Sequence, residues 1–121
     1  MSPIKNTWFH ILFALSRGPM HGSAIMEDVL DRTDGTVKLW PATLYGSLRD
    51  LEERRWIAEA PPTPGTPTEG GKRRFHALTS RGEEILREEL SRMHALLTEA
   101  RARDLLSGPA GGSLGESETA G

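Results

Sequence analysis

Apolar residues recur with the period of an α-helix in three short segments of the first half of the chain. The first segment covers residues 8–15, follows Asn6 or Thr7 as a capping residue, and ends before Gly18-Pro19. The second opens at His21 or Ser23, and the third begins at Pro41. Three short helices joined by tight turns predict a helix-turn-helix arrangement.

The third predicted helix has one apolar and one polar side. Pro41 suits the first helical position, and Leu44, Leu48 and Leu51 form the apolar stripe. The other side is small, hydroxylated and singly basic, and it holds Thr43, Tyr45, Gly46, Ser47 and Arg49. Such a side can enter a DNA groove, because nothing bulky blocks it and its donors can reach phosphates or base edges. Taken alone, the stretch favours an ordinary amphipathic helix with a polar outer side.

The next segment predicts a β-hairpin with a long tip. Residues 56–60 and 72–78 are typical of two short strands. The four prolines and three glycines of residues 61–71 exclude a helix or a paired strand between them. A basic run opens the second strand and meets no acid before Glu83, which favours a phosphate contact; it consists of Lys72, Arg73 and Arg74. A ribbon after three helices is the outline of a winged helix, and a solvated hairpin is the alternative.

The last helix is predicted from Thr79, which suits a capping position. Its apolar positions alternate steps of four and three residues, and they are Leu86, Leu90, Met93, Leu97 and Ala100. A domain of this size cannot cover so long a seam, so we expect it to pair with a second chain. The alternative is a helix folded back on its own domain. Trp8 is interpreted as a core or interface residue, and residues 107–121 are expected to be a disordered tail.

Composition narrows the functional classes. The chain has 121 residues and a net charge of -2, and it has 15 Lys and Arg against 17 acids. Glu116 and Glu118 lie in the tail, so the charges of residues 1–106 balance and any nucleic-acid surface must be local. The absence of cysteine excludes disulfides and fits a cytoplasmic protein. No stretch approaches the roughly 20 apolar residues of a membrane span, and the N-terminus lacks a secretion signal.

The sequence shows no pattern of an enzyme. It contains no P-loop and no Gly-x-Ser-x-Gly, and its four histidines are scattered among four segments. Metal sensing would need clustered His or acidic ligands. No catalytic residue, cofactor or metal site is therefore predicted.

Several linked motifs occur in one order along residues 8 to 100, roughly. They are Gly18-Pro19-Met20-His21-Gly22, Ala24-Ile25-Met26, Pro41-Ala42-Thr43-Leu44-Tyr45-Gly46-Ser47-Leu48, Leu51-Glu52, Trp56-Ile57, and Arg73-Arg74-Phe75-His76-Ala77-Leu78-Thr79 with Gly82. Together they resemble the short type of the PadR family of transcriptional regulators. Linked motifs in register are more specific than any one of them.

The resemblance implies a mainly α fold with a small β-hairpin. It implies a winged helix-turn-helix DNA-binding domain in residues 1–78, a C-terminal dimerisation helix in residues 79–106 and a tail in residues 107–121. The implied function is that of a homodimer that binds a pseudo-palindromic operator in double-stranded DNA, usually as a repressor, with release by a small-molecule effector. Carried over by position, the implied DNA-binding residues are His21, Ser23, Ala42, Thr43, Tyr45, Gly46, Arg49, Lys72, Arg73 and Arg74. The implied dimerisation residues are Trp8, Leu86, Leu90, Met93, Leu97 and Ala100.

The chain also departs from the family's pattern. Members often have aromatic residues at the positions of Ser23 and His76, and Gly or Ser at the position of Trp40. Trp40 offers no side-chain oxygen as a cap, at a cost of about 1 kcal/mol. The last helix lacks the aromatic residues with which some relatives hold flat ligands, which argues against a pocket of that kind. Two other functions stay open: a ligand- or protein-binding winged helix with weak or lost DNA binding, and an adaptor that dimerises through the last helix alone.

Overall fold

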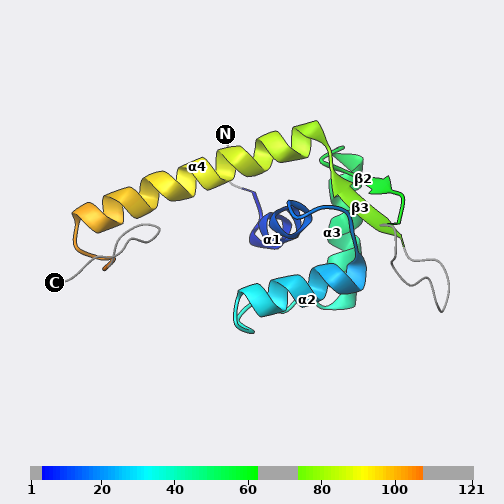
Figure 1. Cartoon of the computed structure of the whole chain (residues 1–121), viewed down its shortest axis with the longest axis horizontal. Coiled ribbons are helices and arrows are strands. Elements are labelled where there is room, and N and C mark those ends of the chain that lie inside the picture. The colour runs from blue at the N-terminus through cyan, green and yellow to red at the C-terminus, as the bar shows by residue number, and fades with distance from the viewer. Residues whose placement is uncertain (1–3, 63–73, 108–121) are drawn as a thin grey trace. The chain divides into compact units, whose positions relative to one another are not determined.

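The structure is a computed structural model that describes residues 4–62 and 74–107. Its elements follow the order α1 (Asn6–Leu15), β1 (Met20–His21), α2 (Gly22–Arg32), α3 (Pro41–Glu53), β2 (Ile57–Ala60), β3 (Phe75–Leu78) and α4 (Ser80–Ala102) (Figure 1). The expected fold, a winged helix-turn-helix followed by a long helix, is confirmed. Most of the predicted hairpin tip, Lys72, Arg73 and the tail beyond Ser107 lie outside the described residues.

The three helices of the winged helix share one core. α1 packs against α2, α3 and β3 (Figure 1). The predicted apolar stripes point inward, and their fully buried members include Ile11, Leu12, Ile25, Leu44 and Leu51. Removing such side chains from water is the main favourable contribution to folding. The periodicity of the sequence therefore identified the buried side of each helix.

Two tryptophans join α1 to the turn that follows α3. The rings of Trp8 and Trp56 meet edge to face, with 5.8 Å between their centroids. The Arg54 guanidinium lies 4.8 Å from the Trp8 ring centroid and 5.5 Å from that of Trp56. Trp8 is consequently a buried residue of its own domain.

The sheet has three strands rather than the two that were predicted. Its order is β1-β3-β2, and both pairings are antiparallel. In β1, Met20 pairs with His76 and His21 pairs with Phe75, where the sequence indicated only a connection. A two-residue strand is too short to show alternation, so its pairing comes from tertiary contact.

The helix ends follow different capping rules. α1 begins after Lys5 without a side-chain cap, so the expectation of Asn6 or Thr7 as the cap was wrong; Asn6 is already helical. His21, one of the two residues expected to open α2, accepts a hydrogen bond at Nδ1 from the Ala24 N–H at 3.3 Å. α3 starts at Pro41 as expected, and Trp40 before it makes no side-chain cap.

Thr79 connects the end of α3 to the start of α4. Its hydroxyl accepts the Gly82 N–H at 3.0 Å and donates to the Arg55 carbonyl at 2.6 Å. Its own N–H donates to the Trp56 carbonyl at 3.1 Å. The predicted capping role of Thr79 is confirmed.

The chain forms two compact units, residues 1–89 and residues 90–121, and α4 runs from the first into the second. The winged helix and the first turns of α4 therefore belong to one unit. Among the described residues, no helix combines the length and the apolar character that crossing a membrane requires.

Candidate nucleic-acid interface

The outer side of α3 is the surface that the sequence singled out. Ala42, Thr43, Tyr45 and Arg49 are exposed there, and Gly46 is partly exposed. Ser47 is only 8% exposed, so its placement on this side was wrong. Its position borders the leucine stripe, and a small hydroxyl fits against the core where a larger polar side chain would not.

Two glycines shape this surface. A Cβ atom added to Gly46 would meet no heavy atom within 4 Å beyond its chain neighbours and the backbone of its own helix, so the helix presents bare backbone to the outside at this point. A Cβ atom at Gly22 would lie 2.8 Å from the Tyr45 hydroxyl oxygen. The missing side chain of Gly22 thus lets the Tyr45 ring of α3 lie over the first turn of α2.

The first turn of α2 carries the other two residues predicted for this surface. Ser23 is exposed, whereas His21 is partly buried. The His21 ring meets Phe75 edge to face, with 5.3 Å between centroids, in addition to capping α2. His21 therefore holds α2 and β3 in position, and Ser23 is the more accessible of the two.

The base of the wing carries a cluster of charges. An Arg74 Nη2 atom lies 3.4 Å from Glu52 Oε2 and 3.2 Å from Glu59 Oε1. In the sequence no acid follows the basic run before Glu83, but this describes only neighbours along the chain. Glu52 comes from α3 and Glu59 from β2, so the fold brings two carboxylates to Arg74.

His76 lies beside the same cluster and is 3% exposed. Its Nε2 atom is 3.4 Å from Glu52 Oε2, and its buried Nδ1 atom has no hydrogen-bond partner among the described residues. Burial lowers the pKa of His76 below its usual 6.5, although Glu52 opposes this effect. The imidazole is therefore neutral at neutral pH.

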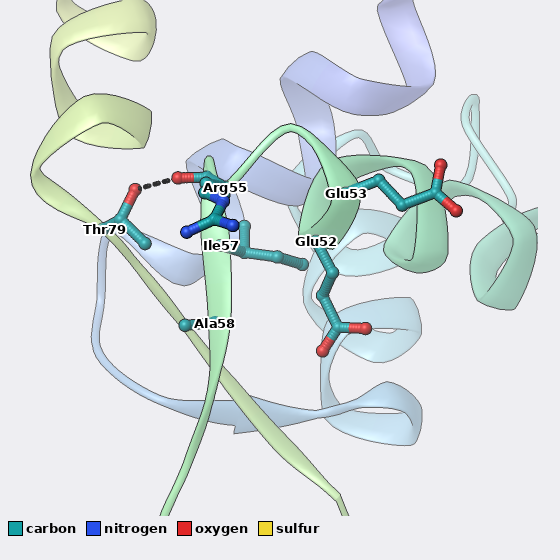
Figure 2. Close-up of a pocket in the computed structure, with 6 residues that line it drawn as sticks. All are labelled: Glu52, Glu53, Arg55, Ile57, Ala58 and Thr79. Atoms are coloured by element: carbon teal, nitrogen blue, oxygen red, sulfur yellow. Dashed lines mark hydrogen bonds between the residues drawn. The ribbon is translucent and has the colours of Figure 1, made fainter.

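A depression of about 510 Å³ lies at the C-terminal end of α3 (Figure 2). Its lining consists of Glu52, Glu53, Arg55, Ile57, Ala58 and Thr79. Figure 2 shows the two glutamate carboxylates pointing away from each other and from the Arg55 guanidinium. The charged groups around this depression therefore do not converge on one point. Within the part of the chain that the structure describes, no three side chains could hold a metal ion together.

The apolar seam of α4 becomes more exposed toward its C-terminal end. Leu86 is buried, and Leu90, Met93 and Ala100 are partly buried. Leu97 is 45% exposed, and the neighbouring Leu96 is 70% exposed. Several large apolar side chains of this helix are thus accessible in a single chain.

The family model of the transcriptional regulator PadR-like family matches residues 11–88. The chain belongs to this family. It is a PadR-family transcriptional regulator, and the predicted membership is confirmed. Comparison with curated proteins gives no match.

Solved structures of PadR-family regulators share the fold. A transcriptional regulator from Clostridium thermocellum is 19% identical, with a TM-score of 0.63 over 84% of this chain and 90% of the other. A PadR-family transcription regulator from Clostridium difficile is 18% identical, with a TM-score of 0.65 over 82% of this chain and 98% of the other. Bacillus subtilis PadR, solved in complex with operator DNA, is 20% identical, with a TM-score of 0.60 over 71% of this chain and 47% of the other.

Two features of this PadR-family surface are not indicated by any local sequence pattern. The carboxylates beside Arg74 come from other elements, and no local pattern indicates them. The close approach of Tyr45 to Gly22 also joins separate helices. The only available signal was a glycine at the start of a predicted helix, where it permits close backbone approach.

Proposed function

We propose that this PadR-family regulator is a homodimer that binds a pseudo-palindromic operator in double-stranded DNA. In this proposal it represses transcription and is released by a small-molecule effector. The observation that carries the DNA-binding part is the outer side of α3, which is exposed, small and basic at Arg49. An α-helix with such a side fits the major groove.

The described residues divide into two roles on the DNA. Ala42, Thr43, Tyr45, Gly46 and Arg49 face the bases of the major groove. Arg49 is exposed and makes no ion pair with any described residue, so its guanidinium is available for a guanine edge or a phosphate. Ser23 and His21, at the start of α2, approach the phosphate backbone, as the first helix elements of such motifs do.

The wing supplies a second contact. Lys72 and Arg73 lie outside the described residues, and their proposed role rests on their charge alone. Arg74 must leave Glu52 and Glu59 to bind a phosphate. Because Arg74 is exposed, the two ion pairs are weak and this exchange costs little.

The dimer is proposed to form through the seam of α4. Leu90, Met93, Leu97 and Ala100 offer apolar surface that a second copy would bury. Trp8 and Leu86 were assigned to the same interface, but each is buried within its own domain, and their part in a dimer stays a prediction. A two-fold axis would place the α3 helices about 34 Å apart, one turn of DNA.

The test is fluorescence anisotropy with a labelled duplex from the region upstream of the protein's own gene, at several salt concentrations. We expect competitor-resistant binding with two subunits per duplex. Thr43→Ala and Arg49→Ala should change the preference among sequences. Removing the charges of Lys72, Arg73 and Arg74 should weaken binding to all sequences and flatten the salt dependence.

Two results would contradict this division of roles. If both sets of variants scale affinity equally on every sequence, α3 does not read the bases. If scrambled DNA removes all binding, either the operator lies elsewhere or the winged helix serves a ligand or protein partner instead. The pairing of Arg74 with two carboxylates is the observation that favours this second candidate.

A further inference from the structure

The segment that leads into α3 has an inner and an outer side. Leu39 is buried and Val37 is partly buried, whereas Lys38 and Trp40 are exposed. Trp40 has an extended backbone, and along extended chain successive side chains point to opposite sides, which agrees with this alternation. Lys38 and Trp40 therefore share the outer side, and the Lys38 Nζ atom lies 4.4 Å from the Trp40 ring centroid.

The Trp40 side chain lies largely outside the core. It is 61% exposed, so it adds little to the core. It stands at the N-cap of α3 without a side-chain cap, and Pro41 after it has no N–H to donate. The exposed Trp40 ring, with the Lys38 ammonium beside it, is available for contact with another molecule.

We propose that Lys38 and Trp40 form a further DNA contact, in which the Trp40 ring lies against the sugar faces of the backbone and Lys38 binds a phosphate. This proposal rests on the proposed function of α3. The DNA backbone alternates apolar sugars with anionic phosphates, and the pair offers an apolar plate beside a cation. The pair also directly precedes Ala42 and Thr43, and the N-terminal residues of a recognition helix are those that reach the DNA.

The charge of Lys38 argues against an apolar protein surface as the partner. Covering the Trp40 ring with such a surface would bury the ammonium group that lies over it, at a large cost in hydration. A phosphate removes this cost, because it replaces water around the ammonium with an anionic acceptor. Duplex DNA is therefore the occupant that suits both members of the pair.

The first experiment measures operator affinity and melting temperature for Trp40→Ser and Lys38→Gln. Serine supplies the missing cap oxygen, so Trp40→Ser should melt no lower than wild type. Its dissociation constant should nevertheless rise at least about fivefold, as for an aromatic residue central to an interface. Lys38→Gln should weaken binding to all sequences and lower the salt slope by about one. Lys5→Gln is the matched control, because Lys5 also lies over a tryptophan ring, 4.9 Å from the centroid of Trp8, but at the start of α1.

The second experiment measures acrylamide quenching of tryptophan fluorescence with and without operator DNA. The difference between wild type and Trp40→Phe isolates the signal of Trp40. We expect DNA to protect Trp40 and the free protein to leave it accessible at all protein concentrations. Protection that grows with protein concentration before DNA is added would place Trp40 between copies of the chain and overturn the proposal.

The outcomes separate this proposal from the one on which it rests. Wild-type protein that binds no duplex specifically would overturn both. A second set of results would overturn only the contact proposed here. In it, the wild-type protein binds its operator, and Trp40→Ser and Lys38→Gln bind no more weakly than Lys5→Gln. Acrylamide also quenches Trp40 as strongly in the complex as in the free protein.

Discussion

Gly46 offers a substitution that should raise stability and lower DNA affinity at once. It lies inside α3, where glycine is about 1 kcal/mol less favourable than alanine. Beyond the neighbouring residues and backbone of its own helix, a new Cβ atom would meet no described atom within 4 Å, so Gly46→Ala adds no clash. The free energy of unfolding should therefore rise by about 1 kcal/mol, which raises the melting temperature by about 4–8 °C for a domain of this size.

The same methyl group projects from the side of α3 that we propose enters the major groove. Closely packed interfaces lose about 1–3 kcal/mol when extra carbon atoms are forced into them, so the dissociation constant should rise about tenfold. Gly46→Met extends the test, because methionine has nearly the helix propensity of alanine but a much longer side chain. Its stability should match that of Gly46→Ala, and its affinity should be lower still.

The assays are thermal unfolding without DNA and anisotropy with operator DNA. Gly82→Ala is the matched control for stability, because it makes the same change inside α4 where a Cβ atom would lie 1.9 Å from the Trp56 carbonyl oxygen. It should lower the free energy of unfolding by about 3 kcal/mol. If Gly46→Met is stabilised but binds the operator as tightly as wild type, the outer side of α3 does not enter the groove.

Three further predictions test the rest of the molecule. Leu97→Glu should turn dimers into monomers by light scattering, and an unchanged mass would exclude the α4 seam as the interface. Glu59→Gln should raise DNA affinity about twofold to fivefold by releasing Arg74. This gain should vanish in an Arg74→Ala background. A gain that persists there would come only from the loss of a negative charge near the DNA. Burial lowers the pKa of His76 below 6.5, so this histidine binds a proton more readily in the unfolded chain than in the folded one. The contribution of His76 to the free energy of unfolding is therefore fully present above that pH and is lost as the pH falls below it. Urea unfolding between about pH 7.5 and 5.5 should show this loss, and His76→Gln should reduce it, whereas an equal slope in the variant would assign the loss to other groups such as His10.

The helices could be predicted because their determinants are local. Leu44, Leu48 and Leu51 repeat with the helical period, and the structure buries all three. Thr79 likewise predicts the start of α4, because threonine is a common N-cap residue and its hydroxyl accepts the Gly82 N–H. The end of α3 could not be predicted from residue type. Arg55, just after this helix, has a positive φ of 64°, a conformation that glycine usually adopts at such a position.

Features that depend on contacts between distant segments could not be predicted. Met20 pairs with His76 through β1, and neither residue carries a pattern that indicates the other. Arg74 looked free of acids because Glu52 and Glu59 lie far from it in the sequence. The family resemblance gave the candidate DNA-binding positions, but only the folded structure shows that Arg74 is already paired.

The hydrogen bonds of Thr79 have a mechanical consequence. They connect the carbonyl groups that follow α3, at Arg55 and Trp56, with the first turn of α4 at Gly82. Thr79 thus bonds the backbone that follows α3 to the first turn of α4. A change in the angle between the end of α3 and the start of α4 would have to break or stretch these three hydrogen bonds, so they resist bending of the chain at this junction.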